Sequence, residues 1–161
     1  MTWIEGTSDA IPEESFDVAV MTSHVAQFFV NDDEWSHVLV ALGCSLVPGA
    51  RLVFDSRDPR DRKWEQWNPA DSRRRVCLPD GREVEAWTEV TAVRGDIVSF
   101  TIHYTFPDEE LESSAALRFR TEDELRTSLQ AAGLTVEQVY GGWNRQPVGE
   151  GDGELLVIAR A

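Results

Sequence analysis

Residues 16–27 read FDVAVMTSHVAQ, and this stretch decides the fold. Val18–Met21 is apolar at every position, which is typical of a strand covered on both faces by helices or other layers. We therefore expect a central strand with parallel neighbours. Thr22, Ser23 and His24 follow at its carboxyl end, where open α/β sheets bind their ligands. The stretch thus predicts part of a ligand site.

Composition and charge limit the class of protein. The chain has 161 residues, the size of one domain, and its 42% hydrophobic residues and six tryptophans exclude a disordered polypeptide. Its 29 acidic against 15 basic residues give a net charge of −14, which repels nucleic acid and anionic membrane surfaces. We expect a partner of neither kind.

The cysteines and the apolar runs indicate the cellular compartment in which we expect the protein. Cys44 and Cys77 lie far apart without a CxxC spacing, and no signal peptide pattern precedes the first strand. No apolar run approaches the roughly 20 residues that span a bilayer. We expect a cytoplasmic protein with reduced cysteines and no membrane insertion.

A helix and a second strand follow the opening stretch. Asn31 or Asp32 is expected to cap the helix, and residues 47–49, VPG, to end it. Its apolar stripe has helical spacing and comprises Trp35, Val38, Leu39, Leu42 and Leu46. Residues 51–56, RLVFDS, then form the next strand. A strand, a helix and a strand in this order predict a parallel, right-handed βαβ unit.

The pattern changes to period two after residue 59. Residues 84–92 and 98–106 each keep one apolar face, and RGD at 94–96 makes the turn between them. PDG at 79–81 favours a hairpin before them. We therefore expect residues 59–118 to form an antiparallel insert or cover.

The last part of the chain returns to the first sheet. Thr121 and Glu124 have the spacing of a capping box, and the helix that they begin is expected to reach Gly133. Residues 134–140 and 154–160 read as an antiparallel pair joined by a glycine-rich loop. That loop holds a GxGxG pattern, but it precedes a strand instead of linking a strand to a helix, so we interpret it as a hairpin loop.

The order of these segments resembles class I S-adenosylmethionine-dependent methyltransferases over nearly the whole chain. Phe16-Asp17 matches the opening of the family's fourth strand, and 47–49 matches the "LxPGG" turn before the fifth, with Ala50 in place of the second glycine. Residues 132–134 match the "aGF" entry to the sixth. The resemblance implies an α/β fold with a truncated Rossmann-like methyltransferase sheet, strands 4-5-7-6, and an antiparallel β insert.

The resemblance also implies a domain layout. Residues 1–161 are expected to form a single methyltransferase-like domain, in which 16–58 and 119–161 are the Rossmann-like part and 59–118 is the insert. Two family elements have no counterpart in this sequence: the GxGxG loop that holds the cofactor's methionine and ribose, and the second strand with its acidic residue. Met1 as an internal start of a longer gene is one explanation that we consider.

Without those elements, the family strand order 3-2-1-4-5-7-6 leaves the strand at 16–22 as an open apolar edge. Such edges are templates for association. We therefore expect a homodimer, or a partner chain, bound through this strand.

The resemblance implies S-adenosylmethionine as the cofactor and a small molecule as the methyl acceptor. Thr22 and Ser23 would face the amino-acid moiety of the cofactor, and His24 would act as a catalytic base or orient the substrate. A capping role for His24 is the alternative. Thr7 and Ser8 stand where relatives contact the adenine, or they are simply loop residues.

Arg57 is a candidate for substrate binding because it ends the second strand at the same edge. It is able to bind a carboxylate in a bidentate manner, although a salt bridge to Asp58 or Asp61 explains it equally well.

Aromatic residues of the insert are further candidates. Trp64 and Trp67 would cover an apolar substrate or pack the insert, and the packing role is the one we favour. His103 and Tyr104 fall on opposite faces of one strand, so at most one of them lines a pocket. We assign His103 to the substrate and Tyr104 to the core.

We expect no metal, because His24, His37 and His103 have no ligand spacing along the sequence. The resemblance favours a methyltransferase of small molecules. The alternative is a non-catalytic dimeric module that kept part of the same fold and binds a ligand or a partner.

Overall fold

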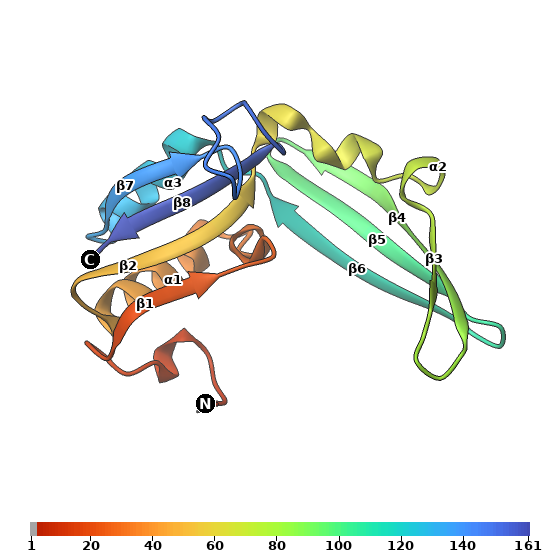
Figure 1. The fold of residues 1–161 in the computed structure, drawn as a ribbon, viewed down its shortest axis with the longest axis horizontal. Coiled ribbons are helices and arrows are strands. Elements are labelled where there is room, and N and C mark those ends of the chain that lie inside the picture. Colours follow the sequence, from red (N-terminus) through yellow and green to blue (C-terminus); the bar gives the residue numbers. More distant parts are fainter. Residues whose placement is uncertain (1–2) are drawn as a thin grey trace. The chain divides into compact units, whose positions relative to one another are not determined.

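The computed structural model describes residues 3–161, so Met1, considered above as an internal start, lies outside the described residues. The chain divides into two compact units. The first combines the described part of residues 1–61 with residues 120–161, and the second comprises residues 62–119. Each unit contains one four-stranded sheet (Figure 1).

The sheet of the first unit has the strand order β1-β2-β8-β7. Its strands are β1 (Phe16–Met21), β2 (Leu46–Arg57), β7 (Thr135–Tyr140) and β8 (Glu154–Arg160). β1 and β2 are parallel, whereas β8 runs antiparallel to both β2 and β7. This is the order that the resemblance implied for strands 4-5-7-6.

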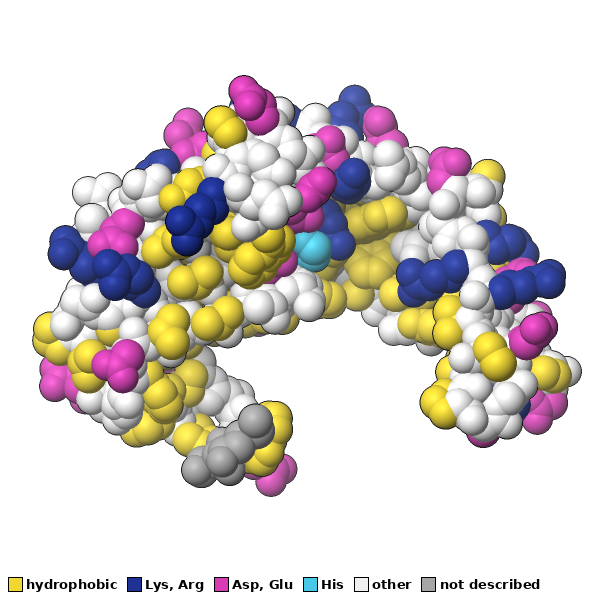
Figure 2. Space-filling view, in the orientation of Figure 1, with side chains coloured by type: hydrophobic (Ala, Val, Ile, Leu, Met, Phe, Trp, Pro, Cys, Tyr) yellow, Lys and Arg dark blue, Asp and Glu magenta, His cyan; other side chains and the backbone are white. Residues whose placement is uncertain are grey.

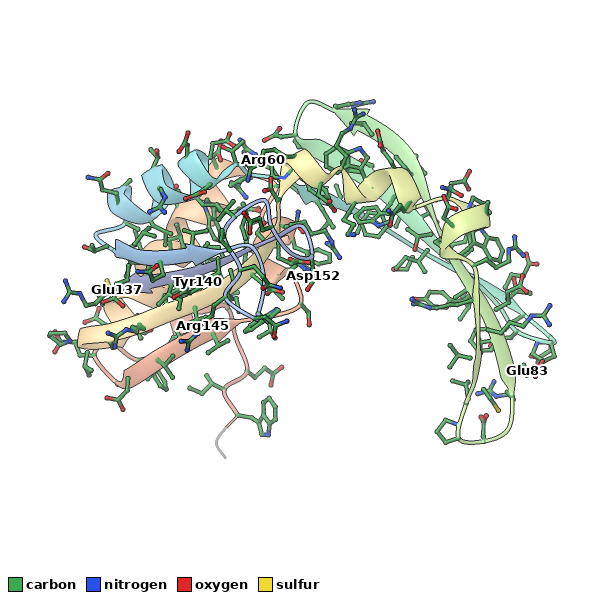
Figure 3. The ribbon with its side chains drawn as sticks, turned by 45° about the horizontal axis from the view of Figure 1, so that its top comes forward. Arg60, Glu83, Glu137, Tyr140, Arg145 and Asp152 are labelled. Atoms are coloured by element: carbon green, nitrogen blue, oxygen red, sulfur yellow. The ribbon has the colours of Figure 1, made fainter. Side chains whose placement is uncertain are left out.

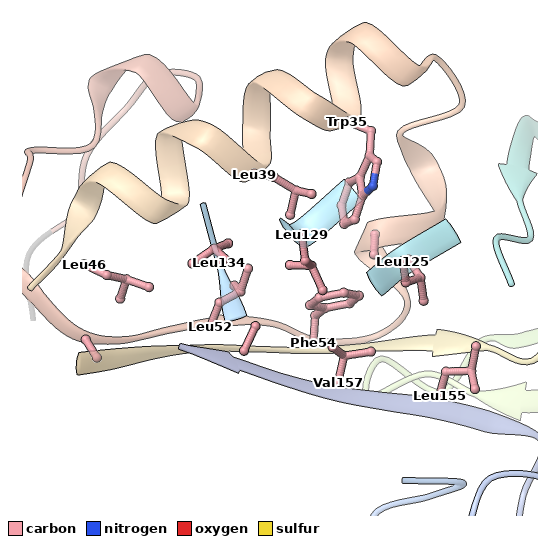
Figure 4. Close-up of a cluster of buried hydrophobic side chains, with 13 residues drawn as sticks. Trp35, Leu39, Leu46, Leu52, Phe54, Leu125, Leu129, Leu134, Leu155 and Val157 are labelled. Atoms are coloured by element: carbon pink, nitrogen blue, oxygen red, sulfur yellow. The ribbon is translucent and has the colours of Figure 1, made fainter. Parts of the chain in front are cut away.

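Two helices cover one face of this sheet, α1 (Asp32–Ser45) and α3 (Glu122–Ala131). Both begin at side-chain caps, because the Asn31 side chain accepts hydrogen bonds from the backbone at the start of α1, and Thr121 forms the expected capping box with Glu124. Figure 4 shows the core that the helices and the sheet enclose. It includes Trp35, Leu39, Leu52, Phe54, Leu125, Leu129, Leu134, Leu155 and Val157.

The apolar run alone predicted a central strand at Phe16–Met21, and that prediction is wrong, whereas its parallel pairing and the open edge that the family strand order implied are both confirmed. β1 is an edge strand that pairs only with β2 among the described residues. Ala19 and Met21 pack on the core, but Val18 and Val20 point to the other face and are 53% and 55% exposed. The apolar run therefore reflects a face of the sheet that α1 and α3 do not cover.

The boundary between α1 and β2 also differs from the expected one. α1 ends at Ser45, and Leu46 already has extended backbone angles, so residues 47–49 lie within β2 rather than in a separate turn. Leu46 pairs with Phe16 in the sheet, and its side chain is still buried in the same core. The helical spacing of Leu46 thus predicted correctly that its side chain is buried, but it predicted a helical backbone where the structure has an extended one.

The second unit is the antiparallel sheet that the period-two pattern predicted. Its order is β3-β4-β5-β6, with β3 (Arg74–Cys77), β4 (Glu83–Arg94), β5 (Ile97–Thr105) and β6 (Glu110–Arg118). The expected alternation in β4 ends at a bulge after Val90, because Val90 pairs with Phe100 but Ala92 pairs with Ser99. Ala92 therefore leaves the face on which the sequence placed it.

Aromatic rings build the core of the second unit. Trp64 packs edge-on against Phe119, with ring centroids 4.5 Å apart, and Trp67 packs against Phe100 at 5.1 Å. The remaining elements are short helices: η1 (Ser8–Ala10) before β1, and η2 (Val25–Phe28), η3 (Pro59–Asp61), η4 (Lys63–Gln66) and α2 (Pro69–Ser72) between the longer elements. Within residues 3–161, no helix combines the length and the hydropathy that crossing a membrane requires.

Candidate functional site

Three segments of the first unit bring polar side chains to one edge of its sheet. β1 and β2 are parallel, so the segment after β1 and the end of β2 meet at their carboxyl ends. β8 is antiparallel, so its first residue, Glu154, pairs with Arg57, the last residue of β2. The topology therefore places a carboxylate from the end of the chain beside residues from its beginning.

His24 lies between two carboxylates at this edge. Its Nε2 atom is 2.8 Å from Oε2 of Glu154 and 3.5 Å from Oδ2 of Asp55. The backbone N–H of His24 donates a hydrogen bond to the other Asp55 oxygen, Oδ1, at 3.2 Å. Asp55 is buried, whereas His24 and Glu154 remain partly accessible to solvent. The site thus has one buried and one accessible carboxylate on the same imidazole nitrogen.

The backbone that carries His24 has an uncommon conformation. Ser23 and His24 both lie in the left-handed region, with φ of 60° and 61°. Non-glycine residues in this region cost of order 1–3 kcal/mol each and persist where the surrounding structure holds them. Here the hydrogen bond from the His24 N–H to Asp55 holds the turn and directs the imidazole toward Glu154.

Arg57 provides the positive charge of the site. Its Nη1 donates a hydrogen bond of 2.9 Å to Oε1 of Gln27, a buried residue of η2. Burial lowers the pKa of Arg57, while the negative charges of Glu154 and Asp55 act in the opposite direction. Asp58, one of the partners that the sequence suggested for Arg57, forms a salt bridge with Arg60.

The loop between β7 and β8 reaches this edge as well, because Glu154 follows it directly. Figure 3 shows Arg145 and Asp152 on this loop. The loop closes on itself, since the Gly141 N–H donates to the Gln146 carbonyl at 2.7 Å. The GxGxG pattern at 149–153 therefore belongs to a loop between two antiparallel strands, as expected.

The structure separates the expected cofactor residues into two places. Thr22 and Ser23 are exposed and adjoin His24 in the chain. Ser8 lines a groove along α1 together with His37 and Cys44, and this groove shares no residue with the cluster around His24. Thr7 is exposed next to Ser8.

The other expected substrate residues, Trp64, Trp67 and His103, belong to the second unit. The two tryptophans line a pocket of about 400 Å³ with Glu89 and also pack its core. His103 stacks on Trp87, with ring centroids 4.9 Å apart, on the face of the sheet opposite Phe100 and Ile102.

Sequence reasoning did not select Asp55, Glu154 or Gln27 as site residues. Asp55 carried a signal, because it lies near the carboxyl end of a strand expected to be parallel to the first. The sequence held no signal for Glu154, because its place at the site depends on the pairing of β8 with β2. Gln27 is recognisable only by its burial.

No family model matches the sequence, and no curated protein matches it. Solved structures match the fold. An S-adenosylmethionine-dependent methyltransferase from Clostridium acetobutylicum superposes with a TM-score of 0.73 at 14% identity, covering 95% of this chain and 61% of that one. CalS10 from Micromonospora echinaspora, an amino pentose methyltransferase involved in calicheamicin biosynthesis, superposes with a TM-score of 0.66 at 20% identity, covering 91% and 58%.

KedS8 from Streptoalloteichus, a sugar N-methyltransferase, has a TM-score of 0.66 at 19% identity and covers 92% of this chain and 57% of its own. The chain thus spans about three-fifths of the length of these structures. At such identities the shared property is the fold. Over almost all of its length, this chain has the fold of part of a class I S-adenosylmethionine-dependent methyltransferase.

Proposed function

We propose that this chain is an S-adenosylmethionine-dependent methyltransferase of small molecules, or a truncated domain of one. The observation that carries this proposal is the cluster of His24, Asp55, Arg57 and Glu154 at the carboxyl edge of β1 and β2, in a fold shared with such methyltransferases. A ligand of an open α/β sheet binds at this edge.

Methyl transfer suits a site without an activated nucleophile. The sulfonium of the cofactor already carries the leaving group, so the protein's task is to position the acceptor and exclude water. We assign His24 to contact with the acceptor, Thr22 and Ser23 to the amino-acid end of the cofactor, and Arg57 to an anionic or carbonyl group of the acceptor. Small-molecule acceptors fit the strongly acidic chain better than nucleic acid does.

Binding of the cofactor is the first test. Calorimetric titration of the purified chain with S-adenosylmethionine is expected to give a Kd in the micromolar range, and the double variant T22A/S23A to weaken it. Ser99→Ala, in β5 of the second unit, is the control and should bind as the unaltered chain does. Absence of binding by the unaltered chain contradicts the proposal and favours the alternative, a non-catalytic module that binds a ligand or a partner.

We also propose that the chain forms a homodimer through β1. The strand has one neighbour among the described residues, and its open edge offers backbone groups that a second strand is able to pair. The exposed Val18 and Val20 extend the apolar surface beside that edge, and hydrophobic side chains lie open over this region in Figure 2. A second chain bound here would cover the open edge of β1 as well as the exposed valines.

Measuring the molar mass by light scattering at several protein concentrations tests the dimer. The unaltered chain is expected at twice the monomer mass, and Val18→Lys and Val20→Lys to shift it to the monomer. Val93→Lys is the matched control, because Val93 is a strand valine of similar exposure, 51%, in the second unit. A monomeric unaltered chain at high concentration contradicts this part of the proposal, and so does an equal effect of all three lysines.

A further inference from the structure

We propose that His24, Asp55 and Glu154 form a binding site for a divalent first-row metal ion of the Mn²⁺ type. The inference goes beyond the proposed methyl transfer, since ion binding needs neither the cofactor nor the acceptor. The three residues come from the turn after β1, from β2 and from the start of β8. One donor atom of each lies within 4.8 Å of the other two.

The distances within the cluster suit a single ion. Nε2 of His24 is 2.8 Å from Glu154 Oε2 and 3.5 Å from Asp55 Oδ2. Around an ion with bonds of about 2.1 Å, donors at these separations subtend about 84° and 113°. These two angles compare with about 90° in octahedral and about 109° in tetrahedral coordination, and the third pair of donors, on Asp55 and Glu154, lies within 4.8 Å.

Asp55 provides an observation independent of the clustering. Its side chain is only 5% exposed, and Oδ1 already accepts the hydrogen bond from the His24 backbone. Oδ2 is in ion-pair range of Nε2 of His24, 3.5 Å away, so it faces the same imidazole nitrogen that contacts Glu154. Two carboxylates on one imidazole nitrogen repel each other, and more strongly where one of them is buried, so a cation at the centre of the cluster would offset this repulsion.

The same hydrogen bond also orients the cluster. Metal-binding carboxylates and imidazoles are usually held by outer hydrogen bonds, and the His24 N–H fixes Asp55 in this manner. The left-handed turn at Ser23 and His24 holds the imidazole on the side of both carboxylates.

The chemistry of the donors selects the kind of ion. One imidazole and two carboxylates favour a first-row ion such as Mn²⁺, Fe²⁺ or Zn²⁺ over Ca²⁺ and Mg²⁺, which prefer oxygen ligands alone. Three protein ligands leave coordination positions open. A hydroxyl or carbonyl oxygen of a small molecule is able to fill one of them, which would orient it at this edge of the sheet.

The charges near the cluster permit a divalent ion. Asp55 and Glu154 each carry one negative charge, and Arg57, held by Gln27, is the positively charged residue that interacts with both of them. With a neutral imidazole these four groups sum to one negative charge, and a divalent ion changes this sum to one positive charge. An anionic ligand atom at an open position would neutralise it.

Electron paramagnetic resonance of Mn²⁺ tests the proposal on the full chain without cofactor. Titration is expected to show one Mn²⁺ bound per chain, and Asp55→Asn and Glu154→Gln each to weaken binding about tenfold or more, because each keeps its shape and loses its charge. His37→Asn is the matched control, since His37 lies beside a carboxylate, that of Asp9, but outside the cluster. It should bind Mn²⁺ unchanged.

Two results would overturn the proposal. One is no saturable binding of Mn²⁺ by the unaltered chain, and the other is an equal loss in H37N and in the two cluster variants. Circular dichroism of each variant separates lost binding from lost folding, and Glu154→Gln, the more accessible position, is the variant expected to fold even where Asp55→Asn does not. Titration with S-adenosylmethionine is separate, so cofactor binding without Mn²⁺ binding rejects the metal site alone.

Discussion

The Nε2 atom of His24 lies 2.8 Å from Oε2 of Glu154, although 130 residues separate the two in the chain. The contact exists because β8 turns back beside β2, which places its first residue at the carboxyl edge of the parallel pair. It makes this edge of the sheet the place where methyl transfer and ion binding are both proposed.

Leu39→Ala is expected to destabilise the first unit by about 2–5 kcal/mol, because Leu39 is fully buried between α1 and the sheet and the smaller side chain leaves a cavity. Urea unfolding measures the loss. Val40→Ala, the next residue of the helix and an exposed one, should change stability by less than about 0.5 kcal/mol. Similar losses in both variants would show that α1 does not pack as described.

Thr121→Ala is expected to cost about 1 kcal/mol, since its hydroxyl accepts the hydrogen bond of the Glu124 N–H at the start of α3. Thr127→Ala tests the same helix at an exposed position, where the hydroxyl only donates to the Asp123 carbonyl. Chemical denaturation should separate the two variants. A Thr127→Ala loss as large as that of Thr121→Ala would argue against the capping box.

Gly153→Ala is expected to destabilise the chain more than Gly81→Ala does. Both glycines have positive φ, 72° and 85°, so alanine costs about 1–2 kcal/mol at either position. At Gly81 a new Cβ meets nothing within 4 Å, whereas at Gly153 it would overlap the Asp61 side chain, whose own Cβ is 2.8 Å away. Thermal unfolding gives the melting temperatures of the two variants, and that of Gly153→Ala should be the lower. Equal melting temperatures would contradict the close approach of Gly153 to Asp61.

Asp58→Asn is expected to make the free energy of unfolding fall less steeply as the pH is lowered into the acid range. Burial acts to raise the pKa of Asp58, but the hydrogen bonds and charge of Arg60 outweigh it, and the pKa is lowered below its ordinary 3.8. A carboxyl with a lowered folded pKa contributes stability that is complete above the unfolded value and is lost as the pH falls through the folded one.

The unaltered chain should therefore lose this contribution as the pH falls below about 4, and Asp58→Asn should lack it at every pH. Unfolding by urea between pH 7 and pH 3 measures the difference. Asp152→Asn, at an exposed loop position, serves as the control. A steeper acid loss in Asp58→Asn than in the unaltered chain would contradict the sign of the shift.

Local patterns in the sequence were enough for most of the secondary structure. The capping box at Thr121, the turn at 94–96 and the helical stripe through Trp35 and Leu39 each depend on neighbours within a few residues, and each appears in the structure. The error at Val18–Met21 has a physical cause. A strand that is apolar on both faces has the same sequence pattern whether or not another layer of the protein covers its second face.

The sequence by itself determined most of the elements, the parallel start of the sheet and the antiparallel insert, because periodicity, caps and turns are local. The order of these segments and the motifs at 16–17, 47–49 and 132–134 carried the resemblance to methyltransferases. Only the tertiary structure decided which side chains form the site. His24 and Asp55 meet because parallel strands end together, and Glu154 joins them because β8 is antiparallel. Linear spacing showed no metal ligands, since these donors converge through strand pairing between segments far apart in the chain.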